Sequence, residues 1–181
     1  MTARRGLMSL AAAGALVASV PAAVEGQVSP DDPRLNLVVR VEDRYVRGTV
    51  GDYCLKITRD GRIVGSGCAD ANVDVRRLPR IRVARGGEVE LRPDAPASQV
   101  RVFAGRPPPR KDLLPVEVAV VEARQVGSMG TRWRARLPRR RFTYIRILVR
   151  YGSPQEYASF FVGIRTAGRC RAASATTRSP A

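Results

Sequence analysis

Two alternating apolar runs near the C-terminal end constrain the fold of this chain more than any other feature. They span residues 142–151 and 156–164 and are separated by the four residues Gly152–Gln155, which include Pro154. In each run the apolar side chains fall on one face: Ile145, Ile147, Val149 and Tyr151 in the first, and Ala158, Phe160, Val162 and Ile164 in the second. Because strand side chains alternate and the connection contains Gly and Pro, the two runs are predicted to form one long antiparallel hairpin.

Short β-type runs separated by turn signals continue this pattern over most of the chain. Further strands are predicted at 35–41, 45–50, 53–58, 62–68, 80–84, 88–92, 100–104, 116–124 and 132–137. Residues 116–124 are nearly continuously apolar and are predicted to form a well-buried strand, whereas Pro107–Pro109 must lie in a loop or at an edge. No convincing amphipathic helix is present. The sequence therefore predicts one all-β domain over 35–165, an antiparallel sandwich of about nine strands, with a barrel as the alternative.

The segment 80–92 is predicted to be a hairpin whose register follows from its side chains. A two-residue loop would pair apolar with charged side chains and mix the two faces. A three-residue loop at Arg85–Gly87 instead pairs Val83 with Val89, Ile81 with Leu91 and Arg82 with Glu90. A slip of one residue moves every side chain to the opposite face, so the second register is predicted.

Three cysteines, Cys54, Cys68 and Cys170, suggest one disulfide and one remaining thiol in an exported chain. The first two lie on the arms of a hairpin around Asp60-Gly61. A three-residue loop at 59–61 would pair Ile57 with Ile63 and place Cys54 opposite Ser66, leaving Cys68 at a diagonal distance of about 7–8 Å, beyond normal bridging reach. A bulge or bend at Gly65–Gly67 would bring the two cysteines together. A Cys54–Cys68 disulfide is therefore predicted, with Cys170 pairing to either cysteine as the alternative.

The first 26 residues have the layout of a signal peptide. Arg4 and Arg5 precede an apolar stretch, Leu7–Val20, of 14 residues, which is shorter than the roughly 20 residues of a membrane-spanning helix. A signal peptide is predicted over 1–22, with cleavage at Gly26, a twin-arginine export route or an uncleaved anchor as alternatives. The mature chain has no second segment of spanning length. A secreted or extracytoplasmic location, in a bacterial cell envelope, is therefore expected.

Two flanking segments lack an apolar pattern and are predicted to be disordered: the lead at 23–34 and the C-terminal tail at 166–181. Between them, the closing part of the domain combines a Trp133-containing strand, a Leu137-Pro138 turn and the long final hairpin. This arrangement resembles the end of an immunoglobulin-like sandwich over about 35 residues. The resemblance implies the fold and no function.

The chain is strongly basic, with a formal net charge of +16, and 30 of its 32 basic residues are Arg. A GC-rich genome would explain the choice of Arg over Lys, but it does not explain the shortage of acidic residues. The densest group, the candidate contacts for a polyanion, is Arg132, Arg134, Arg136, Arg139, Arg140 and Arg141. Alternation sends the first three outward while Trp133, Ala135 and Leu137 point inward. The sequence leaves no exposed aromatic platform among them, which disfavours nucleic acid.

Two interpretations of these arginines are open. They could contact an anionic partner, such as a cell-wall polymer, acidic lipid headgroups or an acidic protein surface. Alternatively, they form a solvated strand face whose charges are partly answered by Glu side chains on neighbouring strands. If the chain after Leu137 crosses to the other sheet, Arg134 and Arg136 are separated from Arg146 and Arg150. We expect this crossover, and therefore only weak and salt-sensitive binding of polyanions.

The chain contains no His, which removes the commonest general base and metal ligand together with every Ser-His or Cys-His arrangement. No cofactor motif or metal-ligand spacing is present, so no cofactor or metal is predicted. The remaining acidic groups are Asp31-Asp32, Glu42-Asp43, and Asp70 with Asp74, which occupy predicted turns or strand ends. We expect a non-catalytic binding or structural module of the cell envelope. The alternatives are a polyanion-binding domain and, less favoured, a carboxylate-dependent hydrolase; the oligomeric state does not follow from the sequence.

Overall fold

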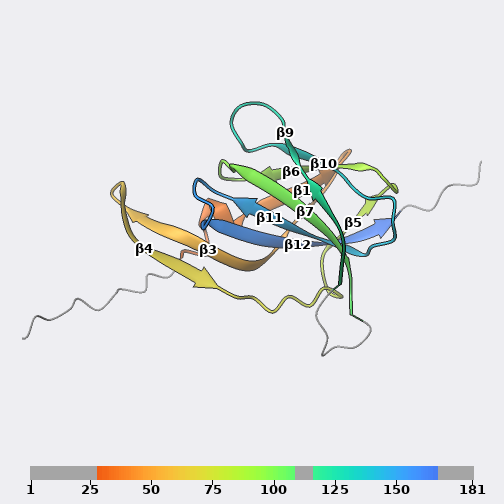
Figure 1. The fold of residues 1–181 in the computed structure, drawn as a ribbon, viewed down its shortest axis with the longest axis horizontal. Helices are drawn as coiled ribbons and strands as arrows, with labels where there is room; N and C mark the ends of the chain where they lie inside the picture. Colours follow the sequence, from red (N-terminus) through yellow and green to blue (C-terminus); the bar gives the residue numbers. More distant parts are fainter. Residues whose placement is uncertain (1–27, 109–115, 167–181) are drawn as a thin grey trace, which may run out of the picture.

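The computed structural model describes residues 28–108 and 116–166, which form two antiparallel β-sheets packed face to face (Figure 1). The smaller sheet has the strand order β2-β1-β6-β10-β9, with bounds Arg44–Arg47, Leu37–Val41, Glu88–Pro93, Trp133–Arg136 and Arg124–Gln125. The larger sheet has the order β4-β3-β12-β11-β7-β8, with bounds Arg62–Ala69, Thr49–Arg59, Tyr157–Thr166, Tyr144–Arg150, Gln99–Arg106 and Val116–Glu122. A further strand, β5 (Arg80–Val83), pairs in parallel with β12. The all-β sandwich is therefore confirmed, with one parallel pair in it.

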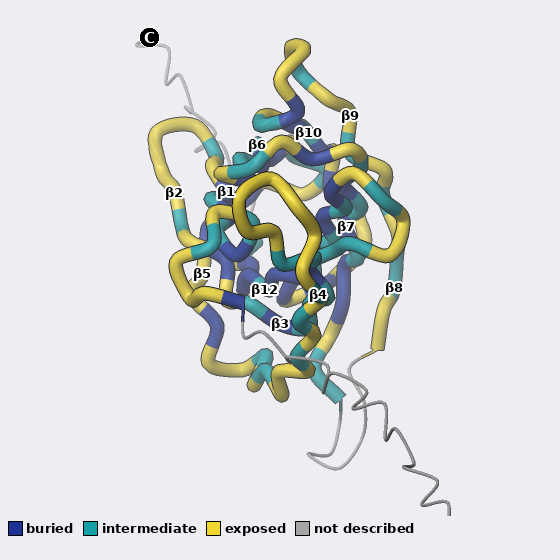
Figure 2. Tube along the Cα trace, turned by 90° about the vertical axis from the view of Figure 1, so that its left-hand side faces the viewer, coloured by how far each residue is buried: buried dark blue, intermediate teal, exposed yellow. Residues whose placement is uncertain are grey.

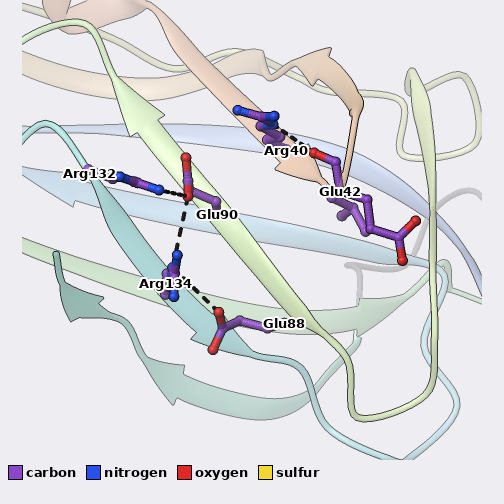
Figure 3. A pocket seen from close by; sticks show the side chains of 7 residues that line it. Arg40, Glu42, Glu88, Glu90, Arg132 and Arg134 are labelled. Carbon is purple, nitrogen blue, oxygen red and sulfur yellow. Dashed lines mark hydrogen bonds and ion pairs between the residues drawn. The ribbon is translucent and has the colours of Figure 1, made fainter.

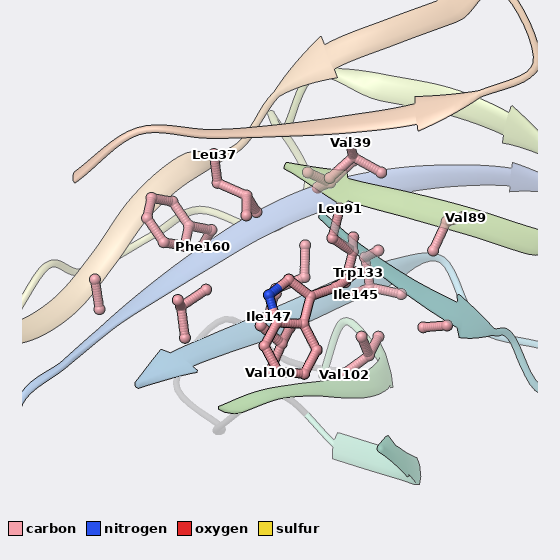
Figure 4. Packing of buried hydrophobic residues seen from close by; sticks show 14 of the residues in the cluster. Leu37, Val39, Val89, Leu91, Val100, Val102, Trp133, Ile145, Ile147 and Phe160 are labelled. Carbon is pink, nitrogen blue, oxygen red and sulfur yellow. The ribbon is translucent and has the colours of Figure 1, made fainter. Parts of the chain in front are cut away.

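The predicted final hairpin is confirmed as the β11–β12 pair at the centre of the larger sheet. Ile147 lies opposite Phe160 in this pair, and the inward side chains of both strands are buried. They meet apolar side chains of the smaller sheet, including Leu37, Leu91 and Trp133 (Figure 4). Because each sheet presents one apolar face, packing the two faces together removes the core from water.

β2 and β3 are nearly continuous in sequence but belong to different sheets, and the chain passes from one to the other at Gly48. A Cβ atom at Gly48 would lie 3.0 Å from the Cβ atom of Phe160, so the change of sheet occurs against the core. Along the same edge of β12, β3 pairs with the first half of the strand, up to Phe161, and β5 pairs with the second half, from Gly163 onward. β2 then lies against β5, and these two edge strands close one side of the sandwich (Figure 2).

The predicted hairpin over 80–92 is wrong. β5 belongs to the larger sheet and β6 to the smaller one, and a turn in which the N–H of Gly87 donates to the carbonyl of Ala84 at 2.9 Å joins them. Ile81 and Leu91 are nevertheless both buried, as predicted. The two side chains face each other across the core instead of lying side by side on one sheet. The alternation of apolar and polar residues along each strand is the same in both arrangements, so it could not distinguish them.

The predicted burial of the strand at 116–124 is also wrong. β8 pairs only with β7, so it lies at an edge of the larger sheet, and β9 follows it in the smaller sheet. Val116 and Val120 are 51% and 58% exposed. The continuous apolar sequence therefore marks an edge strand and not a central one.

The β3–β4 hairpin corrects one prediction and confirms another. Its turn contains two residues, Asp60 and Gly61, which both have positive φ angles (50° and 74°), whereas a three-residue loop was predicted. A bulge after Ile57 places that residue opposite Gly65 instead of Ile63. The shifted register brings Cys54 directly opposite Cys68, with 4.0 Å between their Cα atoms, and the predicted disulfide joins them.

Residues 28–34, which were predicted as part of a disordered lead, are held against the domain. The side chain of Asp32 caps a short 3₁₀ helix (Pro33–Leu35) by accepting the N–H of Arg34. Arg34 forms ion pairs with Asp32 and with Glu156 at the β11–β12 turn, and its carbonyl accepts the hydroxyl of Tyr151 at 2.8 Å. The predicted signal peptide, the lead up to residue 27, the tail after Thr166 and Cys170 lie outside the described residues.

Candidate anion-binding surface

The first two arginines of the predicted group face glutamates on the neighbouring strand. Arg134 lies opposite Glu90 in the β10–β6 ladder, on the outer face of the smaller sheet. Arg132 forms an ion pair with Glu90 at 2.8 Å, and Nε of Arg134 lies 3.5 Å from Glu88 and 3.8 Å from Glu90 (Figure 3). These contacts agree with the interpretation of a solvated strand face whose arginine charges are compensated by Glu side chains on the neighbouring strand. Arg132 and Arg134 are therefore poorly placed to capture a separate anion.

Glu90 is the centre of this compensated surface. Its side chain is largely buried, which by itself would raise its pKa, but hydrogen bonds from Arg132 and Arg92 hold the pKa below its usual value. Glu90 is therefore ionised at neutral pH. The shallow hollow of about 310 Å³ around it is also lined by Arg40 and Glu42, so its charges alternate in sign.

The remaining predicted arginines have no acidic partner among the described residues: Arg136, Arg139, Arg140 and Arg141. Nε of Arg136 donates to the carbonyl of Gly86 at 3.2 Å. The stem of Arg139 packs over the same glycine, where a Cβ atom would come within 3.0 Å of it. The turn at Gly86 therefore contacts Arg136 and Arg139, and neither contact compensates the charge of these arginines.

The predicted crossover after Leu137 is confirmed, because β10 belongs to the smaller sheet and β11 to the larger. Arg134 and Arg146 therefore lie on different sheets. Arg146 is partnered on its own sheet, by an ion pair of 2.5 Å with Glu117 and by stacking 4.6 Å from the ring centre of Phe103. Nη1 of Arg150 donates a hydrogen bond to Oε1 of Gln99 at 3.3 Å. The continuous patch that a hairpin would have produced does not form.

A second basic group, which sequence reasoning missed, lines a hollow of about 370 Å³ where β2, β5 and the end of β12 meet. Its lining residues include four arginines, Arg44, Arg80, Arg82 and Arg165. None of them forms an ion pair with a residue in the described part of the chain. Three separate segments contribute these side chains. Only the alternation of Arg80 and Arg82 was visible in the sequence, and it did not reveal the neighbouring arginines.

Both unpaired groups lie toward the same end of the sandwich. The N–H of Leu137 donates to the carbonyl of Gly87, and the N–H of Ile164 donates to that of Thr143, so the turns after β5 and β10 lie beside the end of β12. Arg85 lies in the turn after β5, and Nε of Arg106 donates to the carbonyl of Arg141 at 2.8 Å, so these two arginines belong to the same end. We call it the basic end and define it by Arg44, Arg80, Arg82, Arg85, Arg106, Arg136, Arg139, Arg140, Arg141 and Arg165. The β3–β4 hairpin projects from the opposite end (Figure 1).

Two of the acidic residues considered for catalysis, Asp32 and Asp74, make local contacts. Asp32 caps the 3₁₀ helix, and its hydrogen bond with Arg34 lowers its pKa. Asp74 accepts the N–H of Arg76 and lies 3.5 Å from Arg77. Within residues 28–108 and 116–166, His, Cys, Asp and Glu form no group of three or more that could hold a metal ion. These contacts are typical of turn residues.

No helix in the described part of the chain is both long and apolar enough to cross a membrane. Comparison of the chain with family models, with curated proteins and with solved structures gives no match. Any functional conclusion therefore rests on the geometry and charge of the molecule itself.

Proposed function

We propose that the protein is a non-catalytic β-sandwich module that works outside the cytoplasm and binds an anionic polymer at its basic end. The observation that carries this proposal is the concentration of arginines without ion-pair partners at that end, among the described residues. On the outer face of the smaller sheet, by contrast, Glu88 and Glu90 form ion pairs with Arg132 and Arg134.

Concentrated positive charge carries a cost that an anionic partner removes. Neighbouring guanidinium groups repel one another, and the field of such a group attracts polyanions and raises their association rate. Guanidinium groups also bind carboxylate, sulfate and phosphate through paired hydrogen bonds. A basic end that faces an anionic polymer would use both effects.

The Cys54–Cys68 disulfide supports the extracytoplasmic location, because structural disulfides persist mainly in oxidising compartments. The signal peptide predicted at residues 1–22 agrees with this location. We therefore infer export to the cell surface, the envelope or the medium.

We also infer that the domain is an immunoglobulin-like sandwich, and the strand order supports this assignment. Taken as strands A, B, E and D, β1, β6, β10 and β9 are neighbours in the ABED order of such domains. In the larger sheet β7, β11 and β12 are neighbours in the order of strands C, F and G. On this assignment β2–β5 are an insertion between strands A and B. The arginines that these strands contribute to the basic end are therefore not part of the common seven-stranded framework.

The experiment that tests the proposal measures retention of the purified mature protein on heparin and on immobilised polygalacturonate. We expect retention at low ionic strength that falls steeply as salt approaches physiological strength, because screening shortens the range of the attraction. The variant R139S/R140S/R141S should elute earlier, whereas R139K/R140K/R141K should elute close to the unmodified protein. No retention at low salt, or retention that persists at high salt in all variants, would contradict the proposal.

A further inference from the structure

We propose that the hollow between β2, β5 and the end of β12 is a subsite for one sulfate, phosphate or carboxylate group of an anionic polysaccharide. This inference rests on the proposed function and identifies the residues that would hold the polymer. The hollow is lined by Asp43, Arg44, Tyr45, Val46, Arg80, Ile81, Arg82 and Arg165.

The central observation is the pairing of Arg82 with Arg165 at directly opposite positions of the parallel β5–β12 ladder. Both residues are exposed. Adjacent strands lie about 4.8 Å apart, so the two side chains leave the sheet next to each other. Like charges in such positions destabilise a sheet, and neither arginine has an acidic partner within the described residues. An oxyanion bound between the two guanidinium groups would convert this repulsion into attraction.

Arg80 extends the same face by one strand repeat, roughly 6.6 Å from Arg82 along β5. It lies opposite Gly163 in the ladder, and a Cβ atom at that glycine would come within 2.7 Å of Cγ of Arg80. The aliphatic part of the Arg80 side chain therefore lies in the space that a side chain at position 163 would occupy. Nη2 of Arg80 also donates to the carbonyl of Arg76 at 3.3 Å, which helps to hold its side chain in place.

β2 completes the hollow from the other sheet. Its residues Arg44, Tyr45 and Val46 line the hollow together with Arg80, Ile81 and Arg82 of β5. Asp43 is the one acidic residue of the lining, so four guanidinium groups face a single carboxylate. The excess positive charge and the concave shape together favour an anionic group over a neutral or cationic one.

The surroundings of the hollow favour a polysaccharide over a membrane or a nucleic acid. Insertion into a bilayer requires exposed apolar side chains, and Tyr45, which is 73% exposed, is the one large exposed hydrophobic residue of the lining. Non-specific binding of single-stranded nucleic acid uses a series of stacking aromatics, which this lining does not provide. A disulfide-containing protein of an oxidising compartment meets acidic polysaccharides there. Tyr45 offers one sugar ring an apolar surface beside the guanidinium groups.

The test compares two double variants that remove the same charge. R82S/R165S removes the facing pair of the hollow. R59S/R62S removes another pair of exposed arginines, which lie opposite each other in the β3–β4 ladder at the other end of the molecule. Affinities for heparin oligosaccharides, oligogalacturonate and polyphosphate would be measured by calorimetry at low and physiological salt. Circular dichroism and thermal unfolding would verify that both variants are folded.

We expect R82S/R165S to weaken binding at least about tenfold, as for the loss of charge-assisted hydrogen bonds, and R59S/R62S to change it less than about twofold. Because heparin carries both sulfate and carboxylate groups, tighter binding of heparin than of oligogalacturonate would identify sulfate, and tighter binding of oligogalacturonate would identify carboxylate. A preference for polyphosphate over both saccharides would show recognition of phosphate without a sugar and would overturn the polysaccharide assignment. Equal weakening by the two variants would overturn the subsite, because only net charge would then matter. Tighter binding to single-stranded DNA or to anionic lipid vesicles than to every saccharide would overturn the polysaccharide assignment.

Failure of this inference can be separated from failure of the proposed function. If R139S/R140S/R141S weakens binding and R82S/R165S does not, the basic end binds polyanions and the hollow is not the subsite. If the unmodified protein binds none of the probes at low salt, the proposed function itself is wrong.

Discussion

The indole N–H of Trp133 donates a hydrogen bond of 2.8 Å to the carbonyl oxygen of Gly130. The same oxygen accepts the backbone N–H of Ala97 at 2.9 Å. Gly130 has a φ angle of +67°, and a Cβ atom there would lie 2.6 Å from the carbonyl oxygen of Ala97. The buried tryptophan therefore fixes the loop before β10 as well as filling the core, and only glycine suits the position that receives its hydrogen bond.

Replacing Trp133, which is 5% exposed, should separate these two roles. W133A should lower the free energy of unfolding by about 3–5 kcal/mol, as for other large aromatic truncations in a core. W133F keeps much of the apolar volume and loses the hydrogen bond, so it should cost clearly less. Denaturant unfolding measures both. A fluorescence maximum of the folded protein typical of water-exposed indole would contradict the burial.

Removal of the disulfide by C54S/C68S should destabilise the protein by about 2–4 kcal/mol, because the bridge restricts the unfolded chain. The two cysteines lie 14 residues apart in sequence. β12 begins beside Cys54 and ends beside Arg82, so retention on heparin should not change. Peptide mapping under non-reducing conditions checks the pairing, and a bridge that contains Cys170 would contradict it.

Acidification should destabilise the protein through Asp32 and Glu90. The pKa values of both carboxyls are lowered in the folded protein, from usual values of 3.8 and 4.5. The unfolded chain therefore binds more protons in this range, and the contribution of these groups is full above pH 4.5 and is lost as the pH falls through the lowered values. Thermal unfolding between pH 7 and pH 2 measures the effect. D32N and E90Q should each flatten this dependence, and an unchanged slope in both variants would be inconsistent with the assignment.

Two valines on neighbouring strands should respond differently to the same substitution. V120T, on the exposed edge strand β8, should change the free energy of unfolding by less than about 0.5 kcal/mol. V102T, on β7, places a hydroxyl at a fully buried position and should cost about 1–3 kcal/mol. Chemical denaturation of both variants provides the comparison. A similar cost at the two positions would indicate that the outer side of β8 is covered.

The faces of individual strands could be predicted because alternation is a local property. The inward positions of Trp133, Ala135 and Leu137 follow from the sequence of one strand and are confirmed. Partner strands are not local. Ile81 and Leu91 are buried whether their strands pair or face each other across the core, so the pattern could not distinguish the two arrangements.

The candidate surface shows the same limit. The arginines between Arg132 and Arg141 are conspicuous as a run, yet the glutamates that answer two of them lie more than forty positions earlier in the chain. The hollow depends on the parallel pairing of β5 with β12 and on the approach of β2. No spacing in the sequence links Arg44 to Arg165, and only the assembled sheets bring them together.

The position of β12 also sets the order in which the molecule can assemble. This last strand of the described chain lies between β11 and β3, and it joins the β3–β4 hairpin, which was synthesised about a hundred residues earlier, to the rest of the larger sheet. Until residues 157–166 are available, the β3–β4 hairpin has no neighbour in the larger sheet and β5 has no partner strand. Pairings across such long sequence distances must close large loops, which makes folding slow. A chain that emerges N-terminus first from a ribosome or a translocation pore therefore leaves this domain incompletely folded until residues 157–166 have passed through.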